Sequence, residues 1–74
     1  MGRLKQIKAR ELVAALKRAG FEEHDQTGSH LILVNEEEDL QTSVPIHGGD
    51  VGRGLLKKIL KQANLTEEEF RELL

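Results

Sequence analysis

The sequence predicts an α+β fold in which a helix is followed by three antiparallel strands, a second helix and a short third helix. Apolar residues recur at the spacing of an amphipathic helix over residues 9–16 and again over residues 55–63. Residues 40–46 instead alternate between apolar and polar side chains, as a half-buried strand does. The apolar run Leu31–Asn35, which turn residues bound on both sides, is typical of a short buried strand.

The first helix is predicted from about Lys8 to Ala19. Gly20 lies just past its apolar stripe, where a residue in the left-handed conformation commonly ends a helix. Because no good capping residue precedes the stripe, we expect a weak helix start. The stripe consists of Ala9, Leu12, Val13 and Leu16.

Three strands are predicted between the two main helices. They span Phe21–Asp25, Leu31–Asn35 and residues 40–46, and tight turns join them, so the sheet should be antiparallel. Gly28 supplies the first turn. Pro45 has no N–H to donate to a ladder, so the third strand should end there or run along a sheet edge.

The second helix is predicted to follow a loop at Gly48 and Gly49, with Asp50 as its N-cap, and to end at Asn64. The two main helices can cover one face of so small a sheet and leave the other face free for a ligand. This α-β-β-β-α layout is that of double-stranded-RNA-binding-like domains. The apolar face of the second helix consists of Leu55, Leu56, Ile59, Leu60 and Ala63.

A last short helix, Glu67–Leu74, has two start signals. Thr66 and Glu69 form a capping box, and Leu65 and Phe70 stand at the offsets of a hydrophobic staple. The chain has 74 residues and shows no linker or repeat, so we expect residues 1–74 to be a single domain.

Composition excludes several classes of protein. The chain has no cysteine, which removes disulfides and thiolate metal sites and fits a reducing cytoplasm. Residues 1–10 are basic but lack the following apolar run of a secretory signal, and no apolar stretch is long enough to cross a bilayer. We therefore expect a cytoplasmic protein with no membrane partner.

The formal net charge is −2, which by itself argues against a nucleic-acid binder, but the cations are clustered. Residues 1–18 carry six Lys or Arg against one acid, and residues 50–62 carry four against one. Local patches of one sign decide binding more than the net charge does. Any single lysine is still more simply explained by a solvated helix face. The candidate contacts to an RNA backbone are Arg53, Lys57, Lys58, Lys61, Lys5 and Arg10.

His30 is the first candidate for chemistry. It follows Gly28 and Ser29 and stands where a strand leaves its turn, a place that is both rigid and reachable. Histidine titrates near pH 6.5 in general, so it can act as base on an RNA 2′-hydroxyl or as acid on the leaving 5′-oxygen. The alternative is a histidine that merely caps the sheet. His30 shares a face with Ile32 and Val34, but both faces of this strand are apolar, so the face that packs on the helices stays open.

His47, in the loop after the third strand, is a second candidate for acid or base, with a solvated loop residue as its alternative. His24 stands between Glu23 and Asp25, and we expect it to be structural or exposed. The histidine spacings of six and seventeen residues match no common zinc signature. We therefore expect no metal and no small-molecule cofactor.

Several short motifs together resemble the HicA family of toxins from toxin–antitoxin systems. They follow the family order over nearly the whole chain, although members are commonly basic overall and this chain is slightly acidic. The motifs are Gly20-Phe21, Gly28-Ser29-His30, Val44-Pro45-Ile46-His47, Gly54-Leu55-Leu56, the run from Ile59 to Leu65, and Glu68-Glu69-Phe70.

The resemblance implies an endoribonuclease that cleaves messenger RNA, is neutralised by a HicB-type antitoxin and uses His30 as its catalytic histidine. Two other functions compete with this interpretation. One is a non-catalytic RNA-binding module of the same fold, which would need the basic residues but not His30. The other is a protein-interaction domain whose basic face meets an acidic partner.

Overall fold

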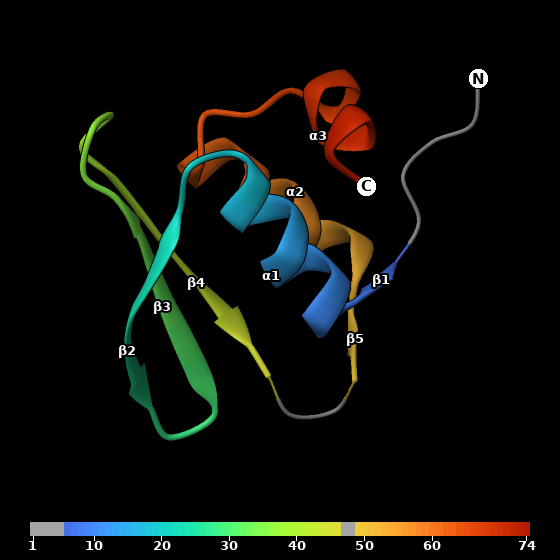
Figure 1. The fold of residues 1–74 in the computed structure, drawn as a ribbon. Coiled ribbons are helices and arrows are strands. Elements are labelled where there is room, and N and C mark those ends of the chain that lie inside the picture. Colours follow the sequence, from blue (N-terminus) through green and yellow to red (C-terminus); the bar gives the residue numbers. More distant parts are fainter. Residues whose placement is uncertain (1–5, 47–48) are drawn as a thin grey trace.

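The computed structural model describes residues 6–46 and 49–74 (Figure 1). The order of its elements is the predicted α-β-β-β-α arrangement of a double-stranded-RNA-binding-like fold, followed by the predicted short C-terminal helix. Two very short strands are present that were not predicted. The elements are β1 (Ile7–Lys8), α1 (Ala9–Arg18), β2 (Glu22–Thr27), β3 (His30–Asn35), β4 (Leu40–Pro45), β5 (Asp50–Val51), α2 (Arg53–Gln62) and α3 (Glu67–Leu73).

The main sheet has the antiparallel strand order β2-β3-β4. Strand β4 lies at an edge and ends at Pro45, so both outcomes predicted for this proline are confirmed. The backbone N–H of Ile46 donates to the carbonyl of Ser29 at 2.8 Å, which makes this a hydrogen-bonded pair. The next pair, His30 with Pro45, is then of the non-hydrogen-bonded kind. The proline nitrogen therefore faces the free edge, where no ladder bond is lost.

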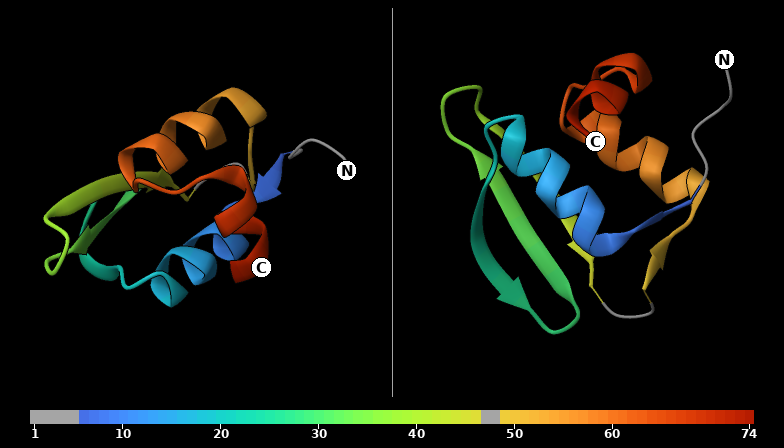
Figure 2. Two further views of the ribbon diagram at one scale, coloured as in Figure 1. Left: turned by 90° about the horizontal axis from the view of Figure 1, so that it is seen from above. Right: turned by 45° about the vertical axis from the view of Figure 1, so that its right-hand side comes forward.

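The two faces of the sheet differ in cover. In β3, Leu31, Leu33 and Asn35 are buried, whereas the alternate residues, beginning with His30, are more exposed. Helices α1 and α2 both lie on the side of the buried set (Figure 2). We call the other side the open face. Because cross-strand partners share a face, its residues are Glu22, Asp25, Thr27, His30, Ile32, Val34, Gln41, Ser43 and Pro45.

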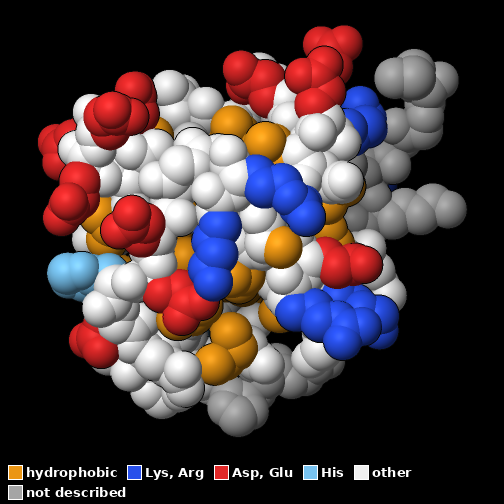
Figure 3. Space-filling view, viewed as in Figure 1, with side chains coloured by type: hydrophobic (Ala, Val, Ile, Leu, Met, Phe, Trp, Pro, Cys, Tyr) orange, Lys and Arg blue, Asp and Glu red, His pale blue; other side chains and the backbone are white. Residues whose placement is uncertain are grey.

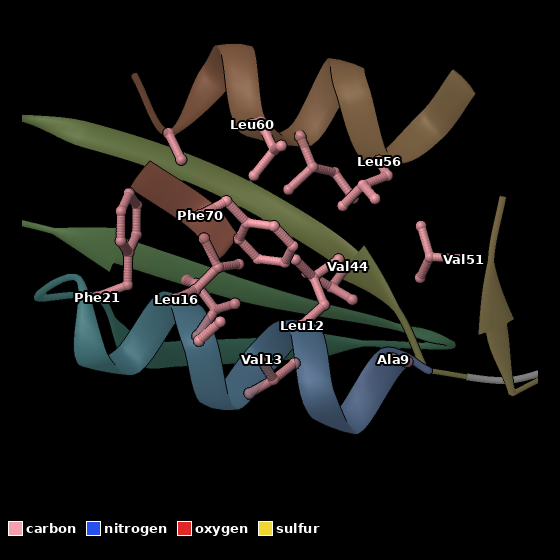
Figure 4. Close-up of a cluster of buried hydrophobic side chains, with 14 of the residues drawn as sticks. Ala9, Leu12, Val13, Leu16, Phe21, Val44, Val51, Leu56, Leu60 and Phe70 are labelled. Atoms are coloured by element: carbon pink, nitrogen blue, oxygen red, sulfur yellow. The ribbon is translucent and has the colours of Figure 1, made fainter. Parts of the chain in front are cut away.

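The core lies between this sheet and the helices. Leu12 and Leu16 of α1 meet Leu33 of β3 and Leu56 of α2, all at 1% exposure or less. Phe70 of α3 is completely buried, and its ring lies between α1 and α2 (Figure 4). Helix α3 therefore closes the core at the side of the two main helices that the sheet does not cover.

Most predicted helix ends are confirmed. Lys8 stands at the N-cap of α1 without a side-chain cap bond, and Gly20 follows the helix with φ +103°. At α3 the capping box is complete, because the Thr66 hydroxyl accepts from the Glu69 backbone N–H at 3.0 Å and the Glu69 carboxylate accepts from the Thr66 backbone N–H at 2.9 Å. Asn64 ends the α2 region with φ +58°.

The prediction that Asp50 caps α2 is wrong. Gly52 is the N-cap, and Asp50 belongs to β5, which pairs antiparallel with β1. The Asp50 carboxylate accepts from the Gln6 side-chain amide at 3.1 Å, so it serves this small sheet instead of the helix. Strands of two residues show no alternation, which is why the sequence gives no sign of them.

Strand β2 is also longer than predicted, because it runs to Thr27 and pairs there with His30. Among the described residues, no helix is long and apolar enough to span a membrane.

Candidate functional site

His30 is the first residue of β3 and is exposed on the open face. It lies between Thr27 of β2 and Pro45 of β4, in the last row of the sheet before the hairpin turn. The structure thus answers the question that the sequence left open, since Leu31 and Leu33 pack on the helices and His30 points away from them. Its side chain makes no hydrogen bond or ion pair with any residue in the described part of the chain.

The turn that carries His30 is held by backbone interactions. Gly28 has φ +59°, a backbone conformation that residues other than glycine rarely adopt. Ser29 is half-buried, and its carbonyl accepts from Ile46 at 2.8 Å. The hairpin end is therefore tied to the end of β4, so the position of His30 is fixed by the sheet while its imidazole stays accessible.

The open face beside His30 is acidic. Glu22 and Asp25 of β2 share this face, and none of its residues is Lys or Arg. Sequence reasoning missed this feature. Strand alternation counted outward from the turn at Gly28 could have found Asp25, because Thr27 opposite His30 puts Asp25 opposite Ile32. It could not have found Glu22, which the bulge between Glu23 and Asp25 brings to this face.

Five of the six predicted RNA-binding cations lie on the two main helices. All five side chains are exposed, and none of them makes a hydrogen bond or ion pair within residues 6–46 and 49–74. Since α1 and α2 cover the other side of the sheet, these cations and His30 occupy different layers. Figure 3 shows Lys and Arg side chains over α1, with acids along the sheet side and over α3. The described cations are Arg10 on α1 and Arg53, Lys57, Lys58 and Lys61 on α2.

Some predicted residues lie outside the described part of the chain, namely Lys5 and His47. His24 is exposed at a bulge of β2, between Glu23 and Asp25. No group of three or more His, Asp or Glu side chains among the described residues is arranged to hold a metal ion.

Comparison with known proteins assigns the family. A family profile described as "HicA toxin of bacterial toxin-antitoxin" matches residues 9–65, which is more than half of the chain. A search among curated proteins finds no match. The matched region runs from the start of α1 into the loop after α2, so it includes the hairpin with His30. The chain therefore belongs to the HicA family of toxins from bacterial toxin–antitoxin systems.

Proposed function

We propose that this toxin is a metal-independent endoribonuclease that cleaves messenger RNA with His30. One observation carries the proposal: an exposed histidine, without a side-chain partner in the described structure, stands on a backbone that the sheet holds in place. A structural histidine would normally be buried or hydrogen-bonded. As base, His30 removes the proton of a 2′-hydroxyl, whose oxygen attacks the adjacent phosphorus and displaces the 5′-oxygen. The products are a 2′,3′-cyclic phosphate and a 5′-hydroxyl.

A second group must protonate the leaving 5′-oxygen, unless His30 or a water molecule does so. His47 follows Ile46 in the sequence, and Ile46 is tied to the hairpin through Ser29. We propose His47 as the candidate for this role. We also propose that residues 1–74 act as one domain and that the partner antitoxin is of the HicB type.

The test compares purified wild-type protein with His30→Ala on messenger RNA in the presence of EDTA. General acid–base catalysis is worth roughly 10²–10⁴-fold, and we expect His30→Ala to lose at least that lower factor in rate. His24→Ala is the matched control, because it removes another exposed histidine of the same sheet, and it should cleave at the wild-type rate. Circular dichroism verifies that both variants are folded. Cleavage by His30→Ala at the wild-type rate, or loss of wild-type activity in EDTA, contradicts the proposal.

The exposed cations on α2 favour one alternative, a module that binds RNA without cutting it. Arg53, Lys57 and Lys61 recur at intervals of four residues and form one row along the helix. Such a row binds phosphates whether or not His30 is catalytic. If His30→Ala and the wild-type protein bind RNA equally and neither cleaves it, the binding module is the better description.

A further inference from the structure

We propose that a shallow hollow between α1 and the hairpin end of the sheet binds one unpaired nucleotide of the RNA, next to the phosphate that the 2′-oxygen attacks when His30 removes its proton. This inference rests on the proposed ribonuclease function and names a substrate subsite for it. The hollow is lined by Ala9, Arg10, Val13, Ala14, Lys17, Leu31 and Ile46.

The hydrophobic core is least covered at this hollow. Among the buried core residues, the three with the largest exposed fractions are Val13 at 9%, Leu31 at 8% and Ala9 at 6%, whereas all others are at 3% or less. All three line the hollow. Half-buried Ile46 adds to the same apolar floor. An apolar floor open to solvent suits the flat surface of a nucleobase, which packs on aromatic or aliphatic side chains.

The rim of the hollow is cationic. Arg10, Ala14 and Lys17 follow one another on the same face of α1, so the two cations stand about 10 Å apart along the helix axis. Arg10 has no partner among the described residues, whereas Lys17 pairs with Glu23 at 2.5 Å. Arg10 is thus the cation available to an RNA phosphate, and charge complementarity favours RNA as the occupant. Figure 3 shows hydrophobic side chains exposed between Lys and Arg side chains on this side of the molecule.

The hollow and His30 share one piece of backbone. Leu31 lines the hollow and directly follows His30, whose side chain is on the opposite face of the same strand. Ile46 lines the hollow and donates its N–H to Ser29, the residue before His30. An RNA strand that passes around the hairpin end reaches both places. It cannot spread over the open face without approaching the carboxylates of Glu22 and Asp25.

The first test is kinetic and uses Arg10→Gln, with Lys8→Gln as the matched control. Lys8 is exposed at the same end of α1 but does not line the hollow. Loss of one charge-assisted phosphate contact is expected to raise KM roughly ten- to hundredfold, with a smaller change in kcat. The slope of log affinity against log salt concentration should decrease in magnitude by about 0.7, because one phosphate contact is lost. Arg10→Lys should restore part of the affinity, and Lys8→Gln should behave as the wild-type protein.

The second test detects the nucleotide directly. Methyl NMR spectra of full-length His30→Ala are recorded with a single-stranded hexaribonucleotide, because this variant should bind RNA without cutting it. We expect the methyl signals of Val13, Leu31 and Ile46 to shift, while those of Leu40, at the far end of β4, stay in place.

The outcomes separate the two proposals. If the wild-type protein does not cleave RNA, the proposed function fails and the subsite fails with it. If cleavage depends on His30 but Arg10→Gln matches Lys8→Gln in KM, the subsite alone is refuted. Methyl signals of the hollow that do not move at saturating hexaribonucleotide also refute the subsite alone.

Discussion

Replacing Phe70 with alanine is expected to destabilise the protein by about 3–5 kcal/mol, the usual cost of removing a buried phenylalanine. The ring has 0% exposure and lies between α1 and α2 (Figure 4). Helix α3 is only seven residues long, too short to be stable alone. The ring therefore both completes the core and holds α3 in place.

This loss is large relative to the total stability. At 0.05–0.15 kcal/mol per residue, a 74-residue domain has roughly 4–11 kcal/mol. With a urea m-value of about 1 kcal/mol/M, a loss of 3 kcal/mol lowers the unfolding midpoint by about 3 M. Phe70→Ala is then partly or wholly unfolded in buffer if the wild-type protein lies at the low end of that range. Phe70→Leu keeps part of the apolar volume and should fall between alanine and the wild type.

The assay is urea unfolding followed by circular dichroism. Glu72→Ala is the control, because Glu72 is exposed on the same helix and its removal leaves the core intact. The reasoning is refuted if Phe70→Ala moves the midpoint no further than Glu72→Ala does. That result would mean that α3 contributes no cooperative part of the fold.

Two further predictions concern helix ends. Gly20→Ala should lower the free energy of unfolding by at least about 1 kcal/mol, because φ at this residue is +103° and an added Cβ would lie 3.1 Å from the side-chain nitrogen of buried Asn35. Thermal unfolding measures this loss, and an unchanged melting temperature contradicts the prediction. Thr66→Ala should cost about 1 kcal/mol because it removes the capping hydroxyl of α3. Thr66→Ser keeps a hydroxyl, so equal losses in the serine and alanine variants would show that the cap is not the cause.

Local patterns predicted most of the fold because each depends on few neighbours. The alternation over residues 40–46 placed Thr42 and Val44 in the core, and the capping box at Thr66 marked the start of α3. The β1–β5 pair could not be predicted, because its two-residue strands are far apart in the sequence and only tertiary structure brings them together. Asp50 was misassigned for the same reason, since its partner Gln6 lies 44 residues away.

The candidate site was predicted in part. Its hairpin followed from Gly28, and the exposed position of His30 agrees with the expectation of a reachable side chain. The face of His30 could not be predicted, because β3 is apolar on both sides and the sequence does not say where the helices pack. The hollow was missed because Val13 and Leu31 have the pattern of ordinary core residues, and their residual exposure depends on how closely α1 approaches the sheet.

The net charge of −2 is compatible with RNA binding because the charges are segregated. Interactions between exposed charges are largely screened beyond about 8 Å at physiological ionic strength, so surfaces on opposite sides of a folded layer act almost independently. Under the proposed function, RNA is then expected to be attracted to the cations of α1 and α2 and repelled from the open face. The row Thr27–His30–Pro45 is the part of that face nearest the hairpin end, so it can be reached from the α1 side around the turn. A histidine in the position of Val34 would instead lie beside Glu22, at the other end of the sheet. The segregation of charge thus supports the proposed role of His30, which stands at the strand end nearest the cations of α1.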